Sequence, residues 1–264
     1  MIIDSLLDEL KNLKGVISIA IGGSRASGYA DISSDYDVYV YYEHPISSED
    51  RLLILKKYCK QIECNNTFWE TEDNCIMMDD IPIDIIYRNL KDFSDTLDRV
   101  VIQGEASNGY TTCLWHNLLH STIVYDFDGK LKALQNLYDI AYPKALQRKI
   151  ISKNSALLDG YLPSYSDQIV KAIKREDLVS IQHRTTEFLT SYFDIIFALN
   201  KMAHPGEKRL LSICKKECRI LPKNFEKNLN LLFEYMFKDK DVFKKILFEI
   251  ILEIKNTIKE EGFH

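Results

Sequence analysis

The 264-residue sequence has no long hydrophobic run, no C-x-x-C pair and no excess of positive charge. None of its apolar stretches approaches the ~18 residues of a membrane-spanning helix, and the first segment, MIIDSLLDEL, carries acids where a secretion signal needs basic residues. Ten Gly and six Pro, with 46% hydrophobic residues, exclude a disordered or fibrous chain. We therefore expect a folded cytoplasmic protein without a membrane segment.

The cysteines and histidines do not form a metal-binding pattern. The six cysteines include two close pairs, Cys59/Cys64 and Cys214/Cys218, but neither has a second pair at the spacing of a zinc finger. His116 and His120 are four residues apart without the Glu of a zinc protease between them. We expect buried free thiols and structural histidines.

The net charge of −5 argues against a protein that wraps duplex nucleic acid, because such binding depends on Lys and Arg neutralising phosphates. That average conceals two unlike halves. Residues 1–127 hold 10 Lys and Arg against 21 Asp and Glu, a net −11, so residues 128–264 carry +6. A basic helical half could still hold a tRNA.

The hydrophobic pattern changes at about residue 127, from alternating strands and helices to helices alone. We predict an α/β (α+β) fold with two domains of nearly equal size, residues 1–127 with a mixed sheet and residues 128–264 as an all-helical bundle. In the first domain the pattern predicts strands over 16–21, 35–42, 66–71, 74–78, 81–87 and 122–125, and helices over 2–14, 48–62 and 89–103. Helices then follow over about 130–141, 143–159, 165–174, 176–202, 206–217, 222–236 and 239–261.

A glycine-rich turn follows the first predicted strand. Gly22, Gly23 and Ser24 lie between that strand and an expected helix, where bare backbone N–H groups and a hydroxyl can approach an anion closely. Such a turn suits a triphosphate, although a glycine pair in a turn is common for other reasons. Ser24 is not a hydrolase nucleophile, because Ala26 stands where the G-x-S-x-G elbow needs glycine.

Three aspartates in apolar strands are the second feature. Asp35 and Asp37 are two residues apart, so a strand directs both carboxylates to one face, and their repulsion favours a bound cation. Alternatively, both are solvated residues at the strand's exposed start. Asp84 stands alone among apolar residues in IPIDIIY, where an unpaired carboxylate is costly. Oxygen ligands of this kind select Mg²⁺ or Mn²⁺, and three carboxylates can hold two such ions.

The order of Gly23-Ser24, Asp35-x-Asp37 and Asp84 resembles the nucleotidyltransferase superfamily of DNA polymerase β. The Gly-Gly-Ser-Arg-Ala-x-Gly version and the helical second half resemble bacterial small-molecule nucleotidyltransferases, including aminoglycoside and lincosamide enzymes. In the helical half, YFDIIFALN (192–200) and the segment 204–208 resemble bacterial proteins with such a domain. The motif portion covers residues 16–90.

The resemblance implies a role for each motif residue. Gly23 and Ser24 would contact the β- and γ-phosphates, and Asp35, Asp37 and Asp84 would ligate two Mg²⁺ ions as the catalytic residues. Asp84 would also help to deprotonate the acceptor hydroxyl. Arg25 is either a nucleotide-binding residue that pairs with the triphosphate or a surface residue at a helix start.

Residues outside the motifs are weaker candidates. In related enzymes a Lys or Glu of the helical domain completes the active site, and Lys208 and Glu187 are the candidates here. Glu187 is an alternative general base to Asp84. A charged residue on a helix is, however, usually only solvated. Trp69, Trp115 and Tyr110 could stack on a base or acceptor, but packing is the more common role.

The predicted activity is Mg²⁺-dependent transfer of a nucleoside monophosphate, AMP from ATP or another NTP, to a hydroxyl of a small molecule such as an antibiotic, with release of pyrophosphate. One alternative acceptor is a protein or a tRNA. Another alternative is a non-catalytic nucleotide-binding or antitoxin module. The sequence does not define the oligomeric state.

Overall fold

The computed structural model describes residues 1–23 and 35–263, which form two compact units. The first unit comprises Met1–Asp98 and Trp115–Ile140, and the second comprises Arg99–Leu114 and Ala141–His264. The mixed sheet followed by a helical region confirms the predicted fold class. Within the described residues, no helix is both long enough and apolar enough to cross a membrane.

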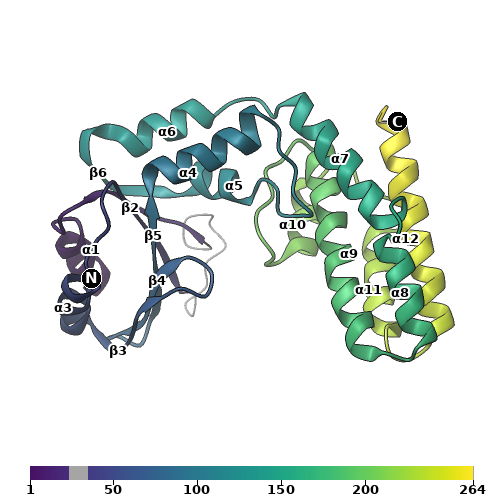
Figure 1. Cartoon of the computed structure of the whole chain (residues 1–264), viewed down its shortest axis with the longest axis horizontal. Helices are drawn as coiled ribbons and strands as arrows, with labels where there is room; N and C mark the ends of the chain where they lie inside the picture. Colours follow the sequence, from purple (N-terminus) through teal and green to yellow (C-terminus); the bar gives the residue numbers. More distant parts are fainter. Residues whose placement is uncertain (24–34, 264) are drawn as a thin grey trace. The chain divides into compact units, whose positions relative to one another are not determined.

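The first unit is built on one six-stranded mixed sheet (Figure 1). Its strand order is β3-β4-β5-β2-β1-β6, with β2 and β5 parallel and every other neighbouring pair antiparallel. The strands are β1 (Val16–Ile21), β2 (Tyr36–Tyr42), β3 (Cys59–Asn66), β4 (Thr71–Met77), β5 (Pro82–Asn89) and β6 (Thr122–Asp126).

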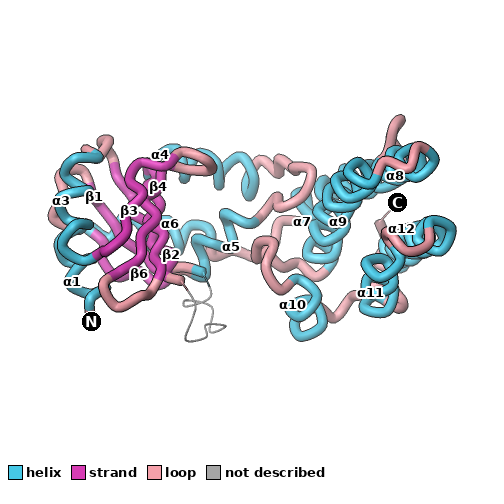
Figure 2. Tube along the Cα trace, turned by 90° about the horizontal axis from the view of Figure 1, so that it is seen from below, coloured by secondary structure: helices cyan, strands magenta, loops and turns pink. Residues whose placement is uncertain are grey.

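Helices lie on both faces of this sheet (Figure 2). The helices α1 (Ile2–Leu10) and α3 (Ser48–Tyr58) cover one face, where their apolar side chains form a core with alternate strand residues such as Val38, Val40 and Ile85. On the other side lie α4 (Leu90–Leu97), α5 (Cys113–His120) and α6 (Lys130–Tyr138). Alternation along β2 therefore directs Asp37, Tyr39 and Tyr41 to the face opposite the Val38 and Val40 core.

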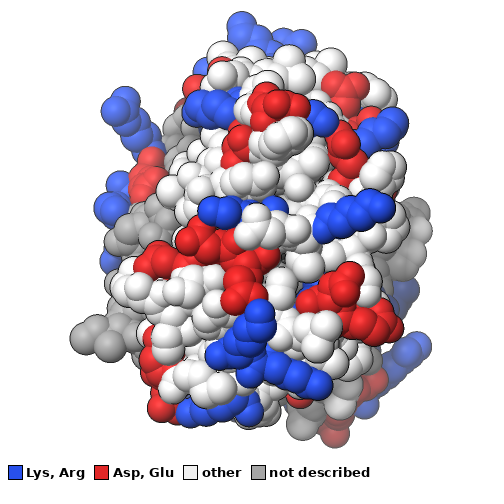
Figure 3. All heavy atoms as spheres, turned by 90° about the vertical axis from the view of Figure 1, so that its left-hand side faces the viewer, with Lys and Arg blue, Asp and Glu red and all other residues white. Residues whose placement is uncertain are grey.

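The outer face beside α1 and α3 carries both signs of charge (Figure 3). Lys57 lies 2.6 Å from Glu9, and Lys11 lies 2.6 Å from Asp8. Acidic and basic side chains are interspersed over this face, so the excess of acids in the first half of the sequence does not form a one-sign patch here.

The second unit is helical. Its elements are α7 (Lys144–Asp159), α8 (Tyr165–Lys174), α9 (Leu178–Leu199), α10 (Leu210–Glu217), α11 (Phe225–Tyr235) and α12 (Lys240–Glu260). The helix α9 contacts α7, α8 and α10, and α12 contacts α7, α8 and α11. The apolar α9 positions expected to face a bundle core are buried, among them Phe188, Tyr192 and Ile196.

The two units do not follow the predicted border between residues 127 and 128. Asp126 explains one difference, because its carboxylate accepts hydrogen bonds from Ser18 of β1 (2.6 Å) and from the backbone N–H of Lys132 in α6 (2.8 Å). This ties α6 to the sheet. Residues 99–114 pack instead with the helical unit, where Thr111 donates to the buried Asp194 of α9 (2.7 Å).

Several predicted elements were wrong in extent. The helix predicted over 48–62 ends at Tyr58, and the chain continues directly into β3, so β3 and β4 replace the strands predicted over 66–71 and 74–78. Pairing of β3 with β4 overrides the local helical pattern here. The helix predicted over 89–103 is α4 followed by a π-helical turn, Asp98–Ile102, and α5 was not predicted at all.

Candidate active site

Asp37 and Asp84 lie side by side at the start of the two parallel strands. They are register partners between β2 and β5, and Asp35 precedes β2 by one residue. One carboxylate oxygen from each of the three lies within 4.8 Å of the others, and all three residues are partly buried. No other cluster of this kind, with at least three ligating side chains, occurs among residues 1–23 and 35–263. The sequence prediction that these aspartates converge is therefore confirmed geometrically.

The Gly22-Gly23 turn lies directly against β2. The Gly22 N–H donates to the carbonyl of Asp37 (2.8 Å). Gly23 has φ of +62°, and a Cβ at this position would lie 1.6 Å from Oδ2 of Asp37. Only glycine fits both the left-handed backbone and this contact. The turn thus brings main chain directly against a carboxylate of the acidic cluster, where no side chain fits.

Asn74 orients Asp84. It lies opposite Asp84 in the β4–β5 ladder, and its Nδ2 donates to Oδ1 of Asp84 (2.8 Å). Its own Oδ1 accepts from Nδ2 of Asn66 (3.0 Å), which fixes the direction of the Asn74 amide. The hydrogen bond from Asn74 therefore fixes the orientation of the Asp84 carboxylate.

A buried polar network lies further along the same sheet face. The Arg88 guanidinium forms two hydrogen bonds with Glu70 (2.8 and 2.6 Å) and a third with Oδ1 of Asn117 (2.8 Å). It also lies over the Tyr39 ring, 4.4 Å from its centroid, and Nδ2 of Asn117 donates to the Tyr39 hydroxyl (2.7 Å). Burial raises the pKa of Tyr39 to about 12, so its phenol is neutral near pH 7.

Glu72 adds a fourth carboxylate to this region. It is 9% exposed, and burial together with the nearby charges of Asp84 and Glu70 raises its pKa. Glu72 thus adds a further carboxylate beside Asp84 on this face of the sheet.

The donor set fits a hard divalent cation. Carboxylate oxygens are the ligands that Mg²⁺ and Mn²⁺ prefer, and three of them within 4.8 Å repel one another unless a cation neutralises them. The carboxylates of Asp35, Asp37 and Asp84 are the groups that would hold the ion.

Two of the predicted nucleotide-binding residues, Ser24 and Arg25, lie outside the described residues. Glu187 and Lys208 belong to the helical unit, where the hydroxyl of Tyr165 donates to Glu187 (3.4 Å) and Lys208 is exposed. Nothing in the described residues tests a role for either in the site.

The aromatic and histidine candidates differ in burial and in their contacts. Trp115 is buried, and its Nε1 donates to the carbonyl of Tyr138 (2.9 Å), which confirms a packing role. Trp69 is 90% exposed on the β3–β4 connection, and Tyr110 lies beside the ring of His204 in the helical unit. His116 and His120 stack on each other with centroids 3.9 Å apart, and burial lowers the pKa of His116 to about 4.

Sequence reasoning missed three residues of the site region, Asn74, Tyr39 and Glu72. Tyr39 had one usable signal, since it lies two residues beyond Asp37 in the strand and must share its face. Asn74 and Glu72 had none, because their place beside Asp84 depends on the β4–β5 register.

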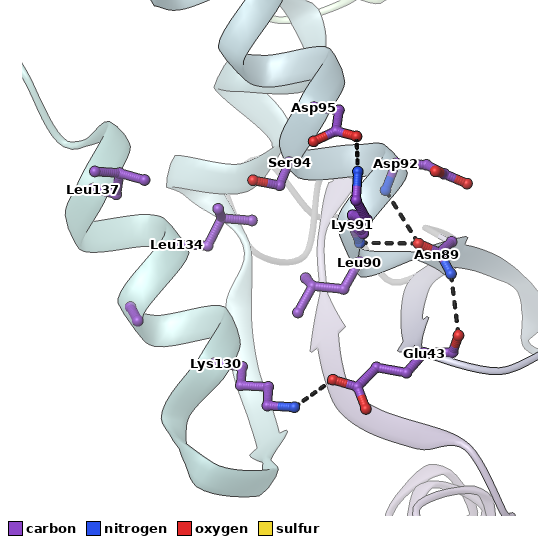
Figure 4. A pocket seen from close by; sticks show the side chains of 11 residues that line it. Glu43, Asn89, Leu90, Lys91, Asp92, Ser94, Asp95, Lys130, Leu134 and Leu137 are labelled. Carbon is purple, nitrogen blue, oxygen red and sulfur yellow. Dashed lines mark hydrogen bonds and ion pairs between the residues drawn. The ribbon is translucent and has the colours of Figure 1, made fainter.

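A groove of about 690 Å³ lies elsewhere in the first unit, between α4 and α6 (Figure 4). Glu43, which directly follows β2, and Asn89, the last residue of β5, line it. Asp37 and Asp84 lie at the opposite end of these two strands. Ion pairs of Lys130 with Glu43 and of Lys91 with Asp95 lie along it. The groove is therefore distinct from the carboxylate cluster.

Comparison with known families decides the class of the first unit. Residues 3–101 match the family model described as a nucleotidyltransferase domain. This segment is a nucleotidyltransferase domain. The match spans the Gly22-Gly23 turn and all three aspartates, so the resemblance seen in the motifs is confirmed for residues 3–101.

Structure comparison matches this chain to solved structures that include three bacterial proteins. A nucleotidyltransferase-like protein from Exiguobacterium sibiricum is 8% identical, with a TM-score of 0.46 over 97% of this chain and 73% of its own. A spectinomycin adenyltransferase from Enterococcus faecialis, solved with ATP and spectinomycin, is 12% identical, with a TM-score of 0.32 over 96% of this chain and 99% of its own. A Thermotoga maritima CCA-adding enzyme complexed with tRNA is 11% identical, with a TM-score of 0.29 over 97% of this chain and 79% of its own.

All three TM-scores are below 0.5, so the family match alone carries the assignment of the nucleotidyltransferase domain. No protein of curated function matches the sequence.

Proposed function

We propose that the protein transfers a nucleoside monophosphate, AMP from ATP in the first instance, to a hydroxyl group of a small molecule and releases pyrophosphate. The observation that carries this proposal is the cluster of Asp35, Asp37 and Asp84 beneath the Gly22-Gly23 turn, within a nucleotidyltransferase domain. The turn brings backbone next to the carboxylates, as a metal-bound triphosphate requires.

Each residue of the cluster has a distinct task in this proposal. Asp35, just before β2, and Asp37, within it, would help to hold divalent cations for the donor triphosphate, and Asp84 on the adjacent β5 would ligate the catalytic cation. When bound, two Mg²⁺ ions would neutralise the triphosphate and favour ionisation of the attacking hydroxyl. Gly23 and Ser24 would contact the β- and γ-phosphates, and Arg25 would pair with the triphosphate.

The acceptor oxygen forms a bond to the α-phosphorus, and the bond from the α-phosphorus to the bridging oxygen of pyrophosphate breaks. The hydroxyl proton needs an acceptor at the same end of the sheet. The Asp84 carboxylate would take it, because Asp84 lies beside Asp37 at this end of the sheet. Glu187 of the helical unit is the alternative base.

The experiment is pyrophosphate release from each of the four ribonucleoside triphosphates, with Mg²⁺ and a panel of aminoglycosides, lincosamides and sugars. Release above background with one acceptor, abolished by EDTA and by Asp37→Asn, supports the proposal. Equal release by the wild type and Asp37→Asn contradicts it.

A macromolecular acceptor is the second candidate, favoured by the +6 charge of residues 128–264. Incubating a cell lysate with ATP labelled at the α-phosphate separates the two, because label in a protein or RNA band indicates a macromolecule. The non-catalytic alternative is less favoured, since all three carboxylates of the cluster are retained. A non-catalytic module would bind nucleotide but transfer none, so the wild type and a variant that lacks one of these carboxylates would both show no transfer.

A further inference from the structure

Two consecutive glycines face two alternate side chains of β2. A Cβ on Gly22 would lie 2.2 Å from Cε2 of Tyr39, and a Cβ on Gly23 would lie 1.6 Å from Oδ2 of Asp37. Asp37 and Tyr39 share one face of the strand. The Gly22-Gly23 turn thus lies against the Asp37 carboxylate and the Tyr39 ring, which are neighbours on this face of β2.

The Tyr39 ring is itself held firmly. It is 6% exposed, the Arg88 guanidinium carbon lies 4.4 Å from its centroid, and Asn117 donates to its hydroxyl. Glu70 in turn fixes Arg88 through two hydrogen bonds. A ring packed on one side by main chain and held through Arg88 and Asn117 has little freedom to move, because packed interiors have few voids.

We propose that Tyr39 is a positioning residue of the active site, whose ring fixes the Gly22-Gly23 backbone at the separation from Asp37 that a metal-bound triphosphate needs. This inference rests on the proposed function and deepens it. Tyr39 touches neither metal nor nucleotide in this account. It acts through Gly22, whose N–H also donates to the carbonyl of Asp37.

Removing the ring should leave space beneath Gly22. The turn can then shift toward β2 and change the distance between Gly23 and Asp37, as the surroundings of a core cavity relax in part. Loss of the hydroxyl alone should matter much less, since the contact with Gly22 is made by ring carbons. Tyr39→Leu and Tyr39→Phe therefore separate the ring from the hydroxyl.

Tyr41 provides the matched control. Its ring is fully buried on the same face of β2 and lies 5.3 Å from the Phe93 ring. The three atoms nearest to an added Cβ belong to Tyr39 at Gly22 and to Asp37 at Gly23, and none belongs to Tyr41. Tyr41→Leu therefore removes an equal ring from the same face, together with its interaction with Arg88, while the Tyr39 ring that lies against Gly22 stays in place.

The first readout needs no ligand. Hydrogen exchange of the Gly22 amide is followed by NMR in conditions where every variant is folded. Tyr39→Leu should accelerate this exchange about tenfold or more relative to the wild type, while Tyr39→Phe and Tyr41→Leu stay within about threefold. No change in Tyr39→Leu, or an equal change in Tyr41→Leu, overturns the proposal.

The second readout is the binding of Mn²⁺ with a non-hydrolysable ATP analogue, measured by electron paramagnetic resonance. Tyr39→Leu should weaken this binding about tenfold or more, with Tyr39→Phe and Tyr41→Leu near the wild type. Faster exchange without weaker binding contradicts the positioning role. A wild type that binds no Mn²⁺-nucleotide contradicts the proposed function instead, and the exchange experiment still tests whether the ring holds the turn.

Discussion

Asp37 and Asp84 are register partners on parallel strands, with ligand oxygens within 4.8 Å of each other and of Asp35. Like charges at such separations repel by roughly 3 kcal/mol per pair at an effective dielectric constant of about 20, less where solvent screens them. A bound cation would relieve this repulsion. Stability and metal binding are coupled through the same three side chains.

Asp37→Asn should accordingly stabilise the metal-free protein. The substitution keeps the side-chain shape and removes one charge, so we expect the free energy of unfolding in EDTA to rise by about 1 kcal/mol. Mg²⁺ at about 100 times its dissociation constant should add about 2.7 kcal/mol to the wild type and much less to Asp37→Asn. Urea titration with and without Mg²⁺ measures both effects. Equal stabilisation of the two proteins by Mg²⁺ would show that the cluster is not the metal site.

Gly23→Ala should disable the cluster. The new methyl group would meet Oδ2 of Asp37 at 1.6 Å, on a backbone with φ of +62°. Gly129→Ala is the matched control, because Gly129 has nearly the same φ, +68°, and nothing within 4 Å of an added Cβ. Both variants should lose about 1–2 kcal/mol from the left-handed backbone. Only Gly23→Ala should also lose Mn²⁺ binding, and retention of that binding would refute the close contact.

Asn74→Ala should impair the reaction more than it impairs folding. Without Asn74, the Asp84 carboxylate loses the hydrogen bond that fixes its orientation. Groups that orient a metal ligand typically contribute about 10–100-fold to metal affinity or activity, and we expect a loss in that range. Asn66→Ala should show a smaller loss in the same direction, because it only orients Asn74. Steady-state kinetics and Mn²⁺ titration measure this order, and a larger effect of Asn66→Ala would be inconsistent with it.

Asp194 should make the helical unit sensitive to pH. Burial raises its pKa to about 6, above the 3.8 of an unperturbed carboxyl, despite hydrogen bonds from Thr111 and Asn154 that lower it. Folding favours the protonated form of Asp194. Its contribution to the free energy of unfolding is therefore complete below about pH 4 and is lost as the pH rises through about 6. The shift corresponds to at most about 3 kcal/mol.

Asp194→Asn, a neutral isostere, should remove that pH dependence. The difference in free energy of unfolding between Asp194→Asn and the wild type should therefore shift in favour of the variant between pH 4 and pH 6.5. Asn154 can support the new amide, because its Oδ1 is buried without a hydrogen-bond partner and can turn toward it. Thermal or urea unfolding across this pH range measures the difference. Parallel curves for the two proteins would mean that Asp194 is ionised when folded.

The sequence was sufficient for the main features of the first unit because they are local. Alternation places Asp35 and Asp37 on one face, and a run of β-branched residues marks β5 around Asp84, so their convergence needed only that the two strands be neighbours. The long apolar face of α9 likewise predicted a bundle core.

The remaining features depend on contacts between distant segments. The first residues of β3 were predicted as the end of a helix. They form a strand because they pair with β4, and that pairing cannot be read from the local sequence. The place of α6 in the first unit depends on Asp126, whose carboxylate joins β1 to the start of that helix. Asn74 and Arg88 were not anticipated, since neither lies near Asp37 or Tyr39 in the chain.

The most direct test of the account is transfer from ATP labelled at the α-phosphate, comparing the wild type with Asp37→Asn in the presence of Mg²⁺ and an acceptor from the panel or the lysate. We predict labelled acceptor and released pyrophosphate with the wild type, and a loss of about 100-fold or more with Asp37→Asn while the protein stays folded. Full activity in folded Asp37→Asn would contradict the proposed role of the aspartate cluster.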